Sequence, residues 1–216
     1  TSIDPSEMED FARCDRFNAV VTDDSKKRRQ TYKMLETMHK EEELWTGNID
    51  DFLRSCNIKA IISAPKEEEI RRCYELLQRT NQLNSSGRRL SIDKVREILQ
   101  DNRYESFVLK SSDKFGDYGT VGFLIIDKNG ERPTVTDFVI SCRVANKKIE
   151  PTLINYLANR YGGKLLFNYK RTLRNGPMHA IIEELAMQPY ASSDTYETYL
   201  CKHDASYPDI VDLRER

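Results

Sequence analysis

The stretch from residue 134 to residue 161 constrains the fold most, because it predicts a buried strand that leads directly into a helix. The strand is too rich in β-branched and aromatic residues to be half exposed, and its apolar members are Val135, Phe138, Val139, Ile140 and Val144. A polar turn follows, and apolar residues then recur at helical spacing at Leu153, Ile154, Leu157 and Tyr161. Pro151 falls in the first helical turn, where its missing N–H costs nothing. We therefore place this strand in the middle of a sheet.

The turn between this strand and this helix predicts an anion-binding site. The first N–H groups of a helix have no partner within the helix, and the helix dipole favours negative charge beside them. Arg143, Lys147 and Lys148 lie next to this helix start in the sequence. We therefore expect a phosphate-bearing ligand at the turn.

Length and composition limit the classes of protein that this chain can represent. Its 216 residues allow one ordinary hydrophobic core with an appendage. Apolar residues make up 38% and charged residues 32%, which is polar for a globular protein but short of disorder. The 34 basic and 35 acidic residues are interspersed, so the overall charge gives no reason to expect nucleic acid or a membrane as partner. No apolar run approaches the roughly 20 residues of a membrane span.

The cysteines and histidines predict a reduced, cytoplasmic protein without a metal centre. There is an odd number of cysteines with no CxxC spacing, and they stand at Cys14, Cys56, Cys73, Cys142 and Cys201. The three histidines are far apart in the sequence, at His39, His179 and His203. We expect no metal in this chain, because neither residue type forms a cluster with ligand spacing.

Residues 1–47 are predicted to form a helical connector arm. A short amphipathic segment spans residues 8–17, and a longer helix is predicted from about residue 25 to Trp45. The charges of this helix oppose its dipole, because residues 26–29 are basic and its last turns are acidic. It must therefore gain stability by docking, either on the main domain or on a missing neighbour. We interpret the basic run as a solvated face, because a nucleic-acid site would interleave it with aromatic residues.

The main domain is predicted over residues 48–203, with residues 204–216 as a C-terminal tail. Besides the buried strand, strands are expected at 58–63, 104–110, 119–127, 164–169 and 196–201. Besides the helix that follows that strand, helices are expected at 50–55, 67–83, 92–100 and 177–187. This order of elements gives a mixed α+β sheet with helices on both faces.

Four ordered motifs in this domain resemble the C-terminal region of the FkbH-like proteins. They are LLQRTNQLN at Leu76–Asn84, GRRLS at Gly87–Ser91, DKFGDYGTVG at Asp113–Gly122 and SCRVANKKIE at Ser141–Glu150. In that family, a phosphatase-like haloacid dehalogenase (HAD) domain precedes a region with the fold of the GCN5-related N-acetyltransferases (GNAT). The TDDSKKR stretch resembles the family's connector helix. The sequence holds no DxDxT motif, so we expect the HAD-like domain to lie outside this chain.

The resemblance implies work on acyl or glyceryl groups that are carried as thioesters in polyketide-like or related biosynthesis. The implied ligand is coenzyme A, an acyl-CoA or phosphopantetheine, and the implied partners are an acyl carrier protein and a HAD-like domain. In the GNAT fold, the backbone of an R/QxxGxG turn binds the pyrophosphate of coenzyme A. Here the pattern begins at Arg143, and Asn146 and Lys148 stand at the two glycine positions.

The resemblance also implies a set of cofactor-binding residues, namely Arg143, Val144, Asn146, Lys147, Lys148 and Asn175. Asn175 comes from the helix after the fifth strand, which in this fold often carries a tyrosine as general acid to the leaving thiolate. Ile182 stands at the tyrosine position and cannot donate a proton. A standard N-acetyltransferase mechanism therefore lacks its usual acid.

Three residues are candidates for catalysis. Cys142 stands where an acyl thioester would lie in this fold, and its thiolate could accept an acyl group, although a cysteine at the end of a buried strand is more often a core residue. Asp113 and Asp117 could act as general base, whereas shaping a turn is their commoner role. The chemistry of these residue types leaves both alternatives open for each of them.

Asn81, Gln82 and Asn84 form a cluster of amides where the helix of residues 67–83 ends. They either bind polar groups of a substrate, or cap the helix and satisfy loop backbone. Two functions follow from these residues and from the resemblance. The leading one is a GNAT-like acyltransferase-type domain that recognises a phosphopantetheine thioester, and the alternative is a non-catalytic docking module that positions a HAD-like domain on its carrier protein.

Overall fold

The computed structural model describes residues 28–216, and their side chains from residue 31 onward. The predicted amphipathic segment at residues 8–17 and the predicted start of the arm helix lie outside the described residues. No helix in the described part of the chain is both long and apolar enough to cross a membrane.

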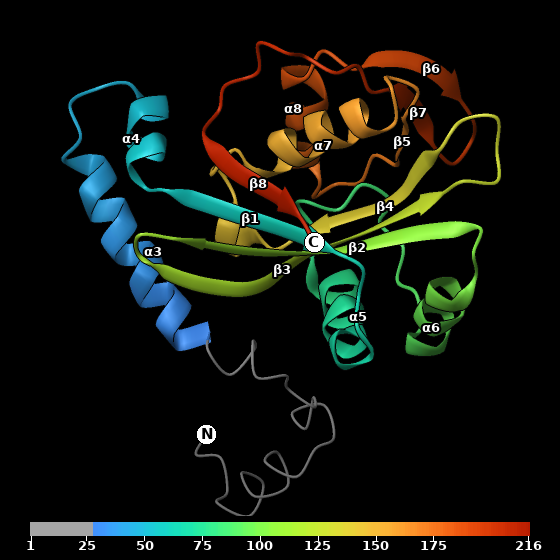
Figure 1. The fold of residues 1–216 in the computed structure, drawn as a ribbon, viewed down its shortest axis with the longest axis horizontal. Coiled ribbons are helices and arrows are strands. Elements are labelled where there is room, and N and C mark those ends of the chain that lie inside the picture. Colours follow the sequence, from blue (N-terminus) through green and yellow to red (C-terminus); the bar gives the residue numbers. More distant parts are fainter. Residues whose placement is uncertain (1–27) are drawn as a thin grey trace, which may run out of the picture.

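One sheet organises the described residues (Figure 1), and its strand order is β6-β7-β5-β4-β3-β2-β1-β8. The strands are β1 (Ile58–Ser63), β2 (Tyr104–Asp113), β3 (Gly116–Asp127), β4 (Thr134–Ile140), β5 (Leu166–Tyr169), β6 (Gln188–Ser192), β7 (Glu197–Leu200) and β8 (Val211–Glu215). Neighbouring strands run antiparallel except in the β4–β5 and β1–β8 pairs. The mixed, largely antiparallel α+β class that was expected from the sequence is confirmed.

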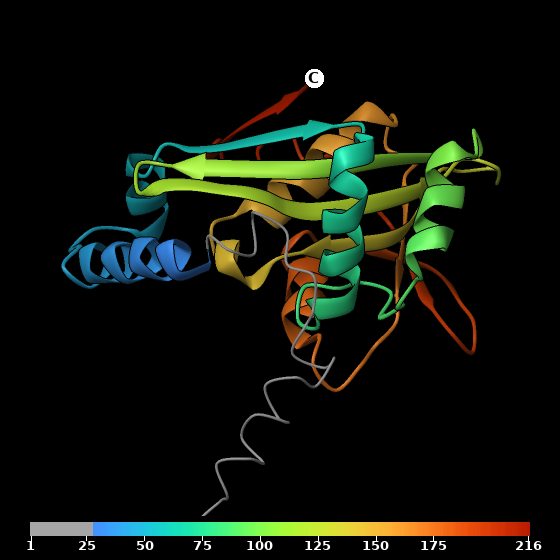
Figure 2. The same ribbon diagram turned by 90° about the horizontal axis from the view of Figure 1, so that it is seen from below.

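Helices cover both faces of this sheet (Figures 1 and 2). On one face lie α5 (Ile70–Arg79) and α6 (Ile92–Gln100), and on the other lie α7 (Ile149–Arg160) and α8 (Gly176–Glu184). α6 has the predicted bounds because Ser91 caps it by accepting a hydrogen bond from the Lys94 N–H at 3.2 Å. The helix predicted over 67–83 is instead a 3₁₀ turn, η1 (Glu67–Glu69), followed by α5.

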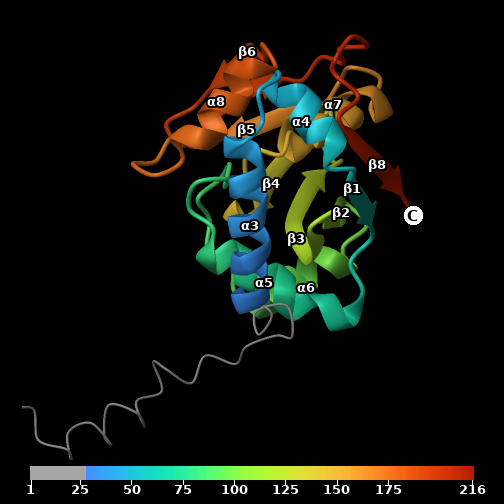
Figure 3. The same ribbon diagram turned by 90° about the vertical axis from the view of Figure 1, so that its left-hand side faces the viewer.

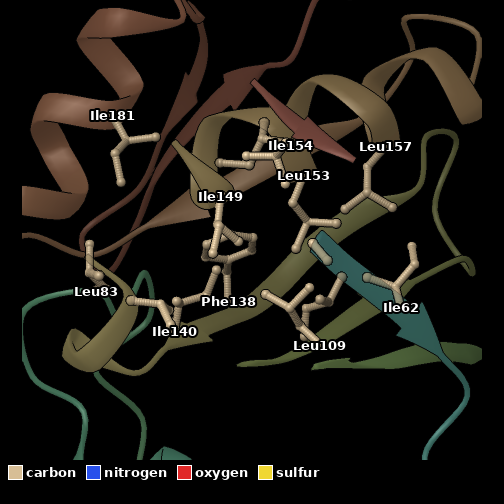
Figure 4. Close-up of a cluster of buried hydrophobic side chains, with 14 of the residues drawn as sticks. Ile62, Leu83, Leu109, Phe138, Ile140, Ile149, Leu153, Ile154, Leu157 and Ile181 are labelled. Carbon is tan, nitrogen blue, oxygen red and sulfur yellow. The ribbon is translucent and has the colours of Figure 1, made fainter. Parts of the chain in front are cut away.

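The larger core lies between the sheet and α7 (Figure 4). Side chains from one stripe of α7 point toward the sheet, where they meet apolar residues of β1, β2 and β4. The labelled members from α7 are Ile149, Leu153, Ile154 and Leu157. A smaller core separates α5 and α6 from the opposite face. β4 is therefore buried on both faces, which explains its unbroken apolar run.

β4 reaches α7 through a short 3₁₀ turn. The strand ends at Ile140, η2 (Cys142–Val144) follows, and α7 begins at Ile149. Val144 was predicted within the strand but lies in this turn, fully buried. The predicted order of a central strand followed by a helix is confirmed, with a tighter junction than the sequence pattern indicated.

The arm helix α3 (Arg28–Glu43) lies against the main domain, beside the turn between β2 and β3 (Figure 3). Met38 is buried and Met34 packs on the larger core, while Lys114 Nζ lies 2.7 Å from Glu41 Oε2. A short helix, α4 (Ile49–Ser55), then leads into β1. Of the two positions considered for the arm, residues 28–43 take the one on the domain. The division at residue 47 stays a prediction.

The structure corrects the reading of residues 204–216 as a tail. Val211–Glu215 form β8, which pairs in parallel with β1 from Ile58 to Ile62. β6 was not predicted either, because its five residues are exposed and show no apolar alternation. Both strands are short and depend on a partner strand, so their own sequence carries little signal.

Candidate functional site

Two of the four motifs, Leu76–Asn84 and Ser141–Glu150, meet at the wall of one cleft. The Cys142 Sγ donates a hydrogen bond to Gln82 Oε1 at 3.5 Å, although the two residues are 60 positions apart. A cleft of about 400 Å³ opens beside Cys142. The backbone of η2 lies between α3 and α5 (Figure 2). Its lining residues are Thr31, Tyr32, Leu35, Arg72, Glu75, Leu76, Arg79, Thr80, Ser141, Cys142 and Arg143. This cleft is the candidate site.

Arginine side chains give the cleft its charge. Arg72 is buried and donates to Thr120 O at 3.0 Å and to Glu75 Oε2 at 3.1 Å. Arg143 donates to Ser141 Oγ at 3.1 Å, and Arg79 is exposed at the rim. Among the described lining residues, three guanidinium groups and one carboxylate carry charge, and the exposed guanidinium of Arg79 suits a ligand that carries a carboxylate or phosphate group. Sequence reasoning missed Arg72 and Arg79, because nothing in the sequence distinguishes them from the other charged residues of a helix.

Cys142 is exposed, so the interpretation of it as a core residue is wrong, whereas the other described cysteines are buried at Cys56, Cys73 and Cys201. Partial burial raises the pKa of the Cys142 thiol, and the Glu150 carboxylate adds to the rise. The thiol is therefore accessible but not activated. Its hydrogen-bond partner is the Gln82 amide, which cannot remove a proton.

Asp113 and Lys147 form a buried ion pair, so neither has the role predicted for it. Lys147 Nζ lies 2.5 Å from Asp113 Oδ2 and 2.7 Å from the Tyr118 hydroxyl, and the two charged side chains are 0–1% exposed. Burial lowers the pKa of Lys147, and its contact with Asp113 opposes that shift. The predicted phosphate-binding lysine and the predicted base are thus structural. Asp117 is exposed and accepts the Gly119 N–H at 2.8 Å, which is its turn-shaping role.

The backbone before α7 keeps the conformation expected of a glycine-rich anion turn. Asn146 and Lys148 stand at the glycine positions, and both have left-handed φ angles, of 65° and 60°. For a residue such as lysine, this conformation costs on the order of 1 kcal/mol. The helical hydrogen bonds begin with the Thr152 N–H donating to Lys148 O at 3.2 Å, and no side chain caps the helix. The N–H groups of residues 146–149 therefore remain uncommitted within the described chain.

The side chains around this turn are not free cations. Lys148 Nζ lies 2.8 Å from Glu184 Oε1 of α8. Glu150, in the first turn of α7, is 2% exposed, and its Oε1 has no hydrogen-bond partner among the described residues. Burial raises the pKa of Glu150 to about 7. Val144 is buried and uses its N–H within η2. A carboxyl group thus lies where the lysines were expected to supply positive charge.

Asn175, predicted to bind cofactor, is committed to the scaffold instead. Its side-chain NH₂ donates to the carbonyl oxygens of Asn84 and Lys170 at 3.0 and 2.9 Å. Its Oδ1 accepts the Tyr169 hydroxyl at 3.0 Å and the Thr172 N–H at 2.8 Å. The side chain is fully buried and has no capacity left for a ligand.

The amides of Asn81, Gln82 and Asn84 were predicted either to bind substrate or to cap the helix and satisfy loop backbone, and the three differ in the structure. Asn84 is buried, donates to Thr80 O at 3.1 Å and accepts two backbone N–H groups, so it satisfies loop backbone. Asn81 is exposed and accepts a hydrogen bond from Arg89 at 2.5 Å. Gln82 is exposed and bonded to Cys142. Of the three, Gln82 is the one placed beside the cleft wall.

Residues 83–85 fill the gap where β4 and β5 diverge. The two strands pair at only two positions, both before residue 136. Beyond them the Ile140 N–H donates to Leu83 O at 2.9 Å, and the Ser85 N–H donates to Phe138 O at 3.0 Å. Figure 4 shows the Leu83 side chain next to Ile140. The Lys170 N–H then donates to Ser85 O at 2.8 Å. The edge of β4 is thus occupied by the chain itself.

The described residues do not offer a metal centre, since no three His, Cys, Asp or Glu side chains among residues 28–216 could hold an ion. The site therefore consists of an arginine-lined cleft with an accessible thiol, beside a turn whose backbone N–H groups have no hydrogen-bond partner among the described residues. This arrangement of β1 to β7, with paired helices after β1 and single helices after β4 and β5, is a GNAT-like fold.

Comparison with solved structures found chains of similar fold at low sequence identity. A domain from Methanocaldococcus jannaschii is 11% identical, with 66% of this chain and 97% of that chain covered and a TM-score of 0.52. The ribosomal-protein-S18-alanine N-acetyltransferase from Escherichia coli is 14% identical, with 69% and 98% covered and a TM-score of 0.46. The PaiA N-acetyltransferase from Thermoplasma acidophilum, in complex with coenzyme A, is 10% identical, with 67% and 99% covered and a TM-score of 0.44. At these identities the likeness concerns the fold alone. No family model and no curated protein matches the sequence.

Proposed function

We propose that this chain is the acyltransferase-type domain of an FkbH-like biosynthetic protein, and that its cleft receives the acylated end of a phosphopantetheine arm on an acyl carrier protein. The observation that carries the proposal is the meeting of Gln82 and Cys142 at the wall of the arginine-lined cleft. Two motifs that resemble the family thus converge on an accessible nucleophile. A HAD-like domain connected through the arm would act on the same carrier protein.

The chemistry that fits this cleft is thioester exchange. The Cys142 sulfur, once deprotonated, attacks the thioester carbonyl of the substrate and forms a new S–C bond. The S–C bond to the pantetheine sulfur breaks, and the departing thiolate takes up a proton. The exposed Arg79 can neutralise the developing oxyanion or hold a phosphate or carboxylate on the acyl group. The raised pKa of Cys142 makes this a slow exchange in the isolated domain.

Coenzyme A laid along β4 does not fit the residues present. The β4 edge is hydrogen-bonded by residues 83–85, and Lys147 and Lys148 are both engaged in ion pairs. The turn before α7 retains backbone N–H groups for a phosphate, but Glu150 adds a buried carboxyl group beside them. A carrier-borne arm that enters from the α3 and α5 side needs neither the β4 edge nor the lysines. We therefore favour the carrier protein as the source of the thioester.

Intact-mass analysis tests the proposal. The chain is incubated with an acyl or glyceryl carrier protein, and with acyl-CoA in parallel, and its mass is followed over time. We expect an acyl adduct from the carrier protein that neutral hydroxylamine removes and that Cys142→Ala abolishes. Gln82→Ala should slow adduct formation without removing it. An unmodified Cys142 after prolonged incubation with a carrier that binds would argue against exchange at this thiol.

The alternative is a non-catalytic docking module, and one observation favours it. Ile182 is buried at the position of the usual general acid, and the described residue that contacts the Cys142 sulfur, Gln82, cannot take its proton. This alternative predicts that the chain binds a carrier protein without ever becoming acylated. The same mass measurement, combined with a binding assay, separates the two functions.

A further inference from the structure

The loop after β5 presents a fully exposed leucine among exposed basic side chains. Leu173 has 106% relative exposure, and Lys170, Arg171 and Arg174 around it are also exposed. Within residues 28–216, Lys170 and Arg174 have no ion-pair partner, and Arg171 Nε approaches Glu197 Oε1 at 4.0 Å. An exposed apolar side chain beside three cations, two of them without a described ion-pair partner, is the composition of a binding surface rather than of an ordinary turn.

Hydrogen bonds to a buried side chain hold the loop in place. Asn175 accepts the Thr172 N–H and donates to Lys170 O, so its buried amide fixes the start and the middle of the loop. Arg171 also contacts His179 Nε2 of α8 at 2.9 Å. A loop that had only to connect β5 to α8 would need no such buried anchor. Pre-organisation of this kind lowers the entropy that docking would otherwise lose.

The loop adjoins the segment that forms the cleft wall. The Asn175 amide donates to Asn84 O at 3.0 Å, and Thr172 lies against Gly87, where an added Cβ would be 3.4 Å from its methyl group. Gln82, two residues before Asn84, contacts Cys142. In two views the loop after β5 projects on the same side as the loop after α5 (Figures 2 and 3). A protein seated on the basic loop would thus lie next to the candidate site.

We propose that residues 170–174 are the docking surface for the carrier protein, which binds them through acidic side chains around an apolar recess that receives Leu173. The inference rests on the proposed function and adds to it the place where the partner sits. Charge complementarity selects an acidic partner, because the loop carries three cations and Arg171 alone among them has a described ion pair, with Glu197. The docked partner directs its arm along residues 82–87 to Cys142.

Binding of a purified acyl carrier protein, in apo form and in holo form with its phosphopantetheine arm, tests this surface. The variants are Leu173→Asp and Arg174→Glu, and the matched controls are Leu44→Asp and Lys128→Glu, because Leu44 and Lys128 are also exposed but lie elsewhere. We expect each loop variant to lower the affinity for both carrier forms by about tenfold or more, and each control variant to lower it by less than about twofold. Binding to wild type should weaken as salt rises. Thermal unfolding confirms that all four variants are folded.

The two carrier forms separate this inference from the proposed function. If the loop variants weaken the binding of apo and holo carrier protein alike, the docking surface stands. If, in addition, the holo form binds wild type no tighter than the apo form does, recognition of the phosphopantetheine arm is overturned and the docking surface is not. If holo binds tighter than apo but the loop variants bind both as wild type does, the docking surface is wrong and the cleft assignment stands. Failure of wild type to bind either form overturns the docking surface.

Discussion

Glu150 carries a buried carboxyl group whose charge the fold disfavours. Burial raises its pKa from 4.5 to about 7, and its Oε1 has no partner among the described residues. Between pH 4.5 and 7 the folded state holds a proton that the unfolded state releases, so the free energy of unfolding falls as the pH rises through this range. Above pH 7 the buried, ionised carboxylate destabilises the folded state by the full amount, on the order of 3 kcal/mol.

Glu150→Gln should therefore stabilise the protein most at high pH. Glutamine keeps the shape and removes the charge, so at pH 8 we expect its free energy of unfolding to exceed that of wild type by up to about 3 kcal/mol, with little difference at pH 4.5. Urea unfolding at pH 4.5, 6 and 8 measures this. Glu183→Gln, on the exposed face of α8, is the control and should follow wild type. Parallel curves for Glu150→Gln and wild type would mean that the carboxyl group stays solvated.

Cys142 should be the thiol that reacts first in the folded protein. The other described cysteines are buried, so in a Cys14→Ser background we expect iodoacetamide to modify one site, and Cys142→Ala to abolish the rapid reaction. Because the pKa of Cys142 is raised, its alkylation rate should still be climbing at pH 9. A rate that levels off below pH 8 would show an activated thiolate and would strengthen the catalytic role.

At the scale of elements, the buried ion pair joins the β2–β3 hairpin to the turn before α7. Lys147→Met leaves Asp113 buried and uncompensated, so we expect a loss of about 3–5 kcal/mol of stability. Lys148→Met is the matched control, since its pair with Glu184 is about one-third exposed and should contribute less than about 1 kcal/mol. Denaturant unfolding compares the two variants. Similar losses for both would show that Lys147 is solvated and free for a ligand.

The hydrogen bonds of Asn175 tie three elements into one unit. They join β5, the start of α8 and the segment 83–85 that completes the sheet beside β4. This unit closes the β4 edge and at the same time presents the basic loop. The closed edge and the presented loop therefore have one structural cause.

At the scale of the whole molecule, β8 protects the edge of the sheet. Without residues 211–216, the β1 edge would be exposed and the burial of Val211 would be lost. We expect the truncated chain to unfold at lower temperature and to self-associate through the open edge, as light scattering would detect. Arg214→Ala is the control, because it removes an exposed side chain and keeps the strand, and it should leave both properties nearly unchanged. A monomeric truncated chain with unchanged unfolding temperature would show that β8 is dispensable.

The sequence alone determined the elements and their order, because strand and helix periodicity and helix caps are local properties. β1 and α6 have the predicted bounds, and the strand-to-helix junction at residues 134–161 is where the apolar pattern placed it. Short strands without such a pattern, β6 and β8, escaped prediction since they form only on a partner. The GNAT-like order of elements followed from these local signals together with the resemblance.

Only the tertiary structure decided which functional groups are free to act. Lys147 looks like a phosphate ligand in the sequence, but its charge is neutralised by Asp113 from 34 residues away. Asn175 looks like a cofactor residue, but its hydrogen bonds are used by Asn84, 91 residues away. Cys142 looks like a core residue, yet it is exposed beside Gln82. Local pattern sets what a segment becomes, whereas the availability of a side chain depends on burial and on partners that folding brings from elsewhere in the chain.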